Sequence, residues 1–193
     1  MKSSLVIPFL FLISLNVLGQ EMGKMTDPRD GKIYNTVDLK ITLEGGIYVH
    51  RIWMADNLAF KSNSSVCYKD EPAYCDAFGR LYNWADVQNV CPEGWHLAKA
   101  KEWNEMINTF GGIYTAGKAL KKEGASNLNM IMGGFGEAGS SFSDVGKSAN
   151  FWSQGEPERY TAPMVSINSA HNEVAEVQIR KTNYNSCRCV ANY

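Results

Sequence analysis

Five cysteines are the residues in this sequence whose type and spacing suggest chemistry: Cys67, Cys75, Cys91, Cys187 and Cys189. Thiols form disulfides in an oxidising compartment, and paired thiolates bind soft metal ions. Because five is odd, at least one thiol must stay free or pair with another chain. We expect Cys187 and Cys189 to point to opposite sides of a strand, so that only one faces Cys91. On that ground we predict no metal at this pair.

The other reactive side chains form no pattern typical of an enzyme. The histidines His50, His96 and His171 are not spaced to share a helix face, and there is no HExxH motif. Ser141 and Ser153 lack the glycine-flanked turn of a nucleophilic serine. We expect His96 to be a hydrogen-bonded structural residue beside Trp95. The sequence therefore predicts a protein that is not an enzyme and uses no cofactor.

Charge and composition indicate one folded domain. The chain has 193 residues, of which 19 are Lys or Arg and 20 are Asp or Glu, for a net charge of −1. This balance excludes the basic surface that attracts nucleic acid. Eleven per cent of the residues are aromatic, enough to fill a sizeable core.

The first residues have the features of a signal peptide. Lys2 precedes an apolar run over residues 5–18, and Val17-Leu18-Gly19 offers a cleavage site. The run is shorter than a membrane-spanning helix requires. We predict a signal peptide over 1–19, a lead-in over 20–25 and one domain over 26–193. No second hydrophobic run follows, so we expect no integral membrane span after cleavage, and a protein secreted or exported to the periplasm or cell surface.

The pattern of elements predicts an α+β fold with short helices, a small antiparallel sheet and long loops. Helices are expected near 81–88, 100–110 and 116–122, the second without a good N-cap. Strands are expected at 47–54, 164–168, 174–180 and 187–190, with brief ones near 130–132 and 150–153. Residues 20–32, 57–77 and most of 123–163 are expected to be irregular. Both ends are strand-like, so we expect them to share a sheet.

Several segments in order along the chain resemble the Fibrobacter succinogenes major paralogous domain family. They are TDPRDGKIY at 26–34, WMADNL at 53–58, FGRLYNW at 78–84, CPEGWHL at 91–97, FWS at 151–153 and RCV at 188–190. The resemblance implies a C-type-lectin-like fold, which formylglycine-generating enzymes also use. It also implies an exported protein of the Bacteroidetes or Fibrobacteres, and no established activity. The family's cysteine positions imply the disulfides Cys67–Cys75 and Cys91–Cys189, with Cys187 as the alternative partner of Cys91.

We therefore expect a non-catalytic binding or adhesion module for an unknown extracellular glycan or envelope protein. One alternative is an oxidoreductase of the formylglycine-generating type with a Cys-bound copper, and another is a structural envelope component. Glu156-Pro157-Glu158 resembles the calcium element of C-type lectins, but its partner element is absent and a solvated loop is expected. Recognition is expected on the glycine-rich segment 123–163; the alternative surface is the early strand around Tyr48 and His50. The expected ligand residues are Asn127, Phe135, Glu137, Phe142, Asp144, Glu156 and Tyr160.

Overall fold

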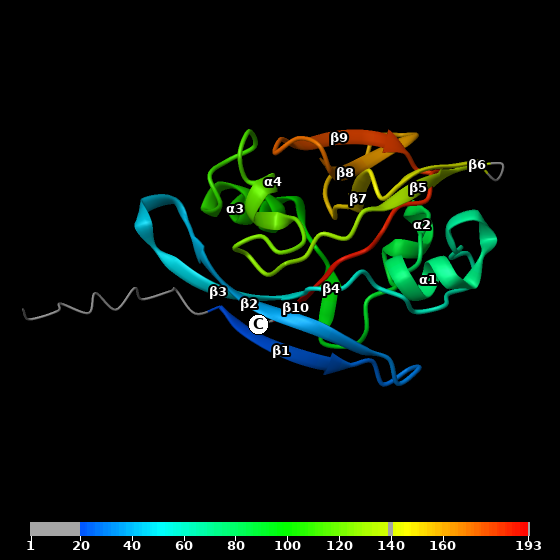
Figure 1. The fold of residues 1–193 in the computed structure, drawn as a ribbon, viewed down its shortest axis with the longest axis horizontal. Coiled ribbons are helices and arrows are strands. Elements are labelled where there is room, and N and C mark those ends of the chain that lie inside the picture. The colour runs from blue at the N-terminus through cyan, green and yellow to red at the C-terminus, as the bar shows by residue number, and fades with distance from the viewer. Residues whose placement is uncertain (1–19, 139–140, 193) are drawn as a thin grey trace, which may run out of the picture.

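The computed structural model describes residues 20–138 and 141–192 (Figure 1). The predicted signal peptide lies outside these residues. They form two five-stranded sheets and a few short helices, which agrees with the predicted α+β class. Among them, no helix is both long enough and apolar enough to cross a membrane.

The first sheet joins the two ends of the chain, as the sequence predicts. Its strand order is β1-β2-β3-β10-β4, and all of its pairs are antiparallel. The strands are β1 (Glu21–Thr26), β2 (Ile33–Thr42), β3 (Tyr48–Met54), β4 (Trp95–Leu97) and β10 (Cys189–Ala191). Val190 pairs with Trp53, which places the C-terminal strand beside the early strand β3.

The prediction that residues 20–32 are irregular is wrong for their first half. Residues 21–26 form β1, whose backbone pairs with β2 along its whole length. A turn at Asp27 closes this hairpin, because its carboxylate accepts from the Arg29 backbone N at 3.0 Å. Polar residues are compatible with this strand because it lies at the edge of the sheet with most side chains exposed.

The second sheet has the order β6-β5-β7-β8-β9, and its β5–β7 pair is parallel. The strands are β5 (Gly133–Glu137), β6 (Ser141–Val145), β7 (Ser148–Trp152), β8 (Thr161–Asn168) and β9 (Val174–Arg180). The segment 123–163, predicted to be mostly loop, therefore supplies three strands, and β7 is buried throughout. The brief strand predicted at 130–132 is wrong, because strand structure begins only at Gly133. At Gly134, φ is +66° and a Cβ would collide with β6 backbone, so glycine here permits close strand pairing.

The helices are α1 (Pro72–Phe78), α2 (Trp84–Val87), α3 (Ala100–Thr109) and α4 (Gly117–Leu120). The last three confirm the predicted helices. The prediction of a loop over 57–77 is wrong for α1, which begins at a proline whose missing N–H costs nothing in the first turn. The missing N-cap of α3 is compensated by Glu102, whose carboxylate accepts from the Lys99 backbone N at 2.9 Å.

One apolar core connects the two sheets through α3. The Trp103 ring of α3 lies 4.8 Å from the Trp53 ring of β3 and 5.6 Å from the Phe151 ring of β7. All three side chains are fully buried. Figure 1 shows α3 and α4 beside the two sheets, which is the position this shared core requires. The sheets therefore belong to a single folding unit.

Candidate functional site

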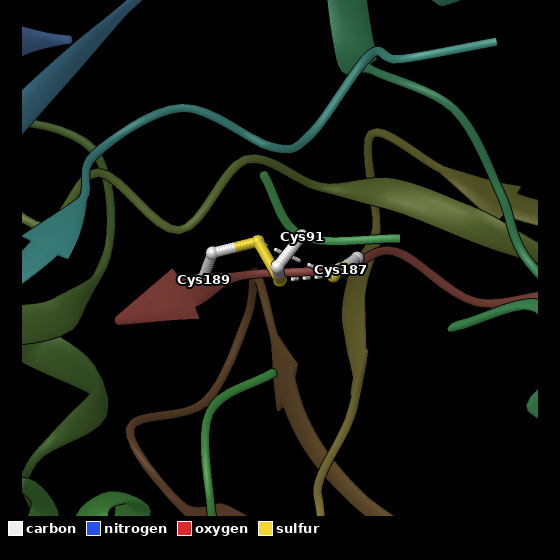
Figure 2. A group of neighbouring side chains, drawn as sticks. All are labelled: Cys91, Cys187 and Cys189. Carbon is white, nitrogen blue, oxygen red and sulfur yellow. Dashed lines mark hydrogen bonds between the residues drawn. A yellow bond between two sulfur atoms is a disulfide. The ribbon is translucent and has the colours of Figure 1, made fainter. Parts of the chain in front are cut away.

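Three of the five cysteines lie together where β10 meets the turn after α2 (Figure 2). Cys91 and Cys189 form a disulfide, and the sulfur of Cys187 lies 3.8 Å from that of Cys91 and 3.9 Å from that of Cys189. The other two cysteines, Cys67 and Cys75, form a second disulfide beside α1. Both disulfides agree with the pairing that the family resemblance implies, and Cys187 keeps a free thiol.

The expectation that Cys187 and Cys189 point to opposite sides is wrong. Side chains alternate from one residue to the next, so residues two apart share a face of an extended chain. Figure 2 shows both sulfurs on the side that faces Cys91. The prediction of no metal at this pair rested on opposite-facing side chains, so that argument no longer holds. In the oxidised protein, however, Cys189 is held in the disulfide, so an oxidoreductase reaction through a Cys187–Cys189 copper pair has only one thiol available.

Burial keeps the Cys187 thiol in its protonated form. It is fully buried, and burial raises its pKa far above the ordinary value, although the neighbouring positive charge of Arg188 partly opposes this. Its sulfur is almost equally distant from both sulfurs of the disulfide, so it lies beside their bond rather than in line with it. Thiol–disulfide exchange requires a thiolate that attacks one sulfur. A protonated thiol beside the bond therefore leaves the Cys91–Cys189 bridge in place.

Arg188, between these cysteines, is a fully buried cation bound to carbonyl oxygens. Its Nη1 donates to the backbone oxygens of Met54 at 2.7 Å and Leu128 at 2.8 Å. Nη2 donates to the Asn129 oxygen at 2.7 Å, and Nε donates to Asn57 Oδ1 at 2.9 Å. Burial lowers its pKa to about 9, so the side chain is still charged at neutral pH. Arg188 thus connects β10, the segment after β3 and the loop before β5.

His96 belongs to a structural network, as the sequence predicts. Its Nε2 lies 2.9 Å from Glu102 and its Nδ1 lies 2.7 Å from Asn192 Oδ1, so both ring nitrogens are engaged. Glu102 Oε1 also lies 3.6 Å from Arg51 Nη1. The other terminal nitrogen of Arg51, Nη2, forms an ion pair with Glu105 Oε2 at 2.6 Å. These contacts orient α3 against β3 and β4.

The predicted ligand residues do not form one group. The Asn127 amide donates to Gln20 at the start of the first sheet. Phe142 is half-buried against Tyr68, with ring centroids 5.3 Å apart. Glu156 and Tyr160 are exposed in the segment between β7 and β8. Of the others, Glu137 and Asp144 are exposed and Phe135 is half-buried in β5.

A hollow lined by both apolar and polar groups opens instead over β2 and β3, and we call it the hairpin hollow. It has a volume of about 500 Å³ and is lined by Gln20, Glu21, Asp38, Lys40, Thr42, Tyr48, His50, Thr109 and Phe110. Lys40 pairs with His50 and Thr42 with Tyr48 across the two strands, which places these four residues on one face. The alternation of half-buried Asp38 and exposed Lys40 and Thr42 with buried apolar residues is the sequence signal that identifies this face.

The charges and the aromatic ring of the hairpin hollow are arranged together. Tyr48 is 57 % exposed, and the Lys40 ammonium lies 4.1 Å from its ring centroid. His50 Nδ1 lies 3.1 Å from Asp38 Oδ1. The hollow therefore offers an aromatic face, a carboxylate, an ammonium and an imidazole within one concave surface.

Comparison with known proteins identifies a domain family. The family model described as the Fibrobacter succinogenes major domain matches residues 48–191, which include the three-sulfur cluster, Arg188 and the β3 side of the hairpin hollow. No curated protein and no solved structure gives a significant match.

Proposed function

Because the chain belongs to the Fibrobacter succinogenes major domain family, a family defined without an activity, we propose its function from its geometry. The protein is an exported, non-catalytic recognition module, and the hairpin hollow is its binding site. Its ligand is a neutral glycan. The observation that carries this proposal is the exposed ring of Tyr48 beside Asp38, Lys40 and His50 in one hollow.

The chemistry of the hairpin hollow favours a sugar ring over a charged ligand. An exposed aromatic ring packs against the apolar face of a sugar, and neighbouring polar groups bind its hydroxyls. The carboxylates of Glu21 and Asp38 lie in the same hollow as the ammonium of Lys40, so the hollow carries charges of both signs. A ligand with many hydroxyls and no charge matches that balance.

The scaffold supports a recognition role. A shared core holds both sheets, and the Cys91–Cys189 disulfide anchors β10 of the first sheet. Tyr48 and His50 project from the hairpin of β2 and β3. We further propose that the fold is a variant of the C-type-lectin-like fold, because strands from both ends of the chain share one sheet and a second sheet follows the helices. In this proposal the ligand lies on the hairpin rather than on the segment 123–163.

Binding to an array of neutral glycans tests the proposal. We expect Tyr48→Ala to weaken binding by about tenfold or more, because it removes the aromatic ring that packs against the sugar. A tenfold loss corresponds to about 1.4 kcal/mol of binding free energy. Asp38→Asn should also weaken binding. The matched control is Tyr114→Ala, which removes a tyrosine that is 74 % exposed outside the hollow.

Two results would contradict the proposal in different ways. Binding that is abolished by Tyr160→Ala but unchanged in Tyr48→Ala would move the site to the segment 123–163. Absence of binding to every neutral glycan would reject the ligand class and favour a structural role in the envelope.

Export is tested by the mature N-terminus. We expect protein recovered from the periplasm, the cell surface or the medium to begin at Gln20, because Val17-Leu18-Gly19 precedes it. N-terminal sequencing or intact mass measurement would identify it, with allowance for cyclisation of the glutamine. A mature chain that retains Met1 would reject the cleavage.

A further inference from the structure

The three-sulfur cluster has a second potential use once its disulfide is opened. We propose that the reduced protein binds one thiophilic d10 metal ion through the thiolates of Cys91, Cys187 and Cys189. The cluster contains three sulfurs within 4.8 Å of one another. This inference does not depend on the hairpin hollow or on its ligand.

The sulfur positions fit a metal ion. Zinc–thiolate bonds are about 2.3 Å long, so sulfurs that share one ion lie roughly 3.8–4.0 Å apart. The Cys187–Cys91 and Cys187–Cys189 separations are 3.8 and 3.9 Å. Two of the three sulfur–sulfur distances therefore already have the required length. The third distance, between the sulfurs of Cys91 and Cys189, has to lengthen after the disulfide between them is broken.

The charge around the cluster fits an anionic metal–thiolate group. Arg188 is fully buried between two of the cysteines in sequence, and none of its four hydrogen bonds goes to a carboxylate. A buried charge is costly unless it is compensated. Three thiolates around a divalent ion carry one net negative charge. The positive charge of Arg188, whose side chain lies on the other face of the chain, would partly offset it, since this charge already acts on Cys187.

The donor set selects the class of metal. The donor atoms of the cluster are all sulfurs, with no imidazole or carboxylate in the group. Sulfur ligands select Zn²⁺ and Cu⁺ over Mg²⁺, Ca²⁺ or Mn²⁺. Cys91 is the partly exposed member, so it gives the ion and the reductant access from solvent.

The chemical step is balanced by a dithiol reductant. The dithiol gives two electrons and two protons to the Cys91–Cys189 disulfide and becomes a disulfide itself. The three cysteine thiols then release their protons as the ion binds. The ion restores the link between β10 and the turn at Cys91 that the covalent bond provided.

The test uses the full mature chain, which is reduced with a dithiol, freed of the dithiol by gel filtration and titrated anaerobically with Cd²⁺. We expect one ion per chain and an ultraviolet sulfur-to-metal charge-transfer band, with Zn²⁺ and Cu⁺ competing for the site. Cys187→Ser should weaken Cd²⁺ binding by about a hundredfold, since loss of a residue that only supports a metal ligand already costs 10–100-fold in affinity. The matched control is the double variant Cys67→Ser/Cys75→Ser, which should bind Cd²⁺ like the wild type.

Thermal unfolding gives a second readout. Cd²⁺ should raise the melting temperature of the reduced wild type, because an ion that binds the folded state stabilises it, and should do so much less for Cys187→Ser. The proposal is overturned if Cys187→Ser binds Cd²⁺ as tightly as the wild type, or if the double variant loses binding. It is also overturned if Cd²⁺ does not raise the melting temperature of the reduced wild type.

Discussion

Cys91→Ser is expected to lower the free energy of unfolding by about 4–5 kcal/mol, because its disulfide closes the longer of the two disulfide loops described. The two partners are 98 residues apart. Removing Cys67–Cys75, whose partners are 8 residues apart, should cost only about 2–3 kcal/mol by the same relation. Urea unfolding of Cys91→Ser and of the double variant Cys67→Ser/Cys75→Ser measures both values.

Cys189→Ser is expected to lose much less stability than Cys91→Ser. The sulfur of Cys187 lies 3.8 Å from that of Cys91 on the same side, so the variant can form a Cys91–Cys187 bridge. Peptide mapping without reductant should find that bridge. Equal losses in the two single variants, with no Cys91–Cys187 peptide, would show that Cys187 is held too rigidly to replace Cys189.

Arg188→Met is expected to lower the free energy of unfolding by about 3–5 kcal/mol, because it leaves three buried oxygens and one part-buried oxygen without this donor. Three of these oxygens belong to the backbone of Met54, Leu128 and Asn129. A methionine fills much of the volume, so the loss reports mainly the missing hydrogen bonds. The stability of Arg188→Lys should lie between that of the wild type and that of Arg188→Met, since lysine keeps the charge but lacks the planar set of donors.

The matched control is Arg180→Met on the exposed strand β9, which should change stability by no more than about 0.5 kcal/mol. Denaturant unfolding of the three variants gives the comparison. Wild-type stability in Arg188→Met would mean that the cost of burying the guanidinium equals the gain from its hydrogen bonds.

The RCV motif at 188–190 is one of the segments that carry the family resemblance, and the structure shows what each of its residues does. Arg188 binds the segment after β3 and the loop before β5, Cys189 is bonded to Cys91, and Val190 pairs with Trp53 in the core. Three consecutive residues thus make three different long-range connections. The short strand β10 therefore holds together segments that lie far apart along the chain.

The amino-acid sequence by itself determined the elements whose pattern is local and strong. The i, i+3, i+4, i+7 spacing of Trp103, Met106, Ile107 and Phe110 predicts α3, because one helix face must be buried. Runs of β-branched and aromatic residues predict β3, β8 and β9 in the same way. The cysteine positions, through the family resemblance, indicated both disulfides.

Tertiary structure alone decided the elements and contacts that depend on a distant partner. β1 and β5 are polar or rich in glycine, and they are strands because β2 and β6 offer them a backbone ladder. The three-sulfur cluster forms because Cys187 and Cys189 share a side of the chain and residue 91 folds back onto it. The hairpin hollow requires the register of Lys40 with His50 and of Thr42 with Tyr48. Local patterns reflect which side chains must be buried, whereas strand pairing and side-chain clusters depend on which distant segments the fold brings together.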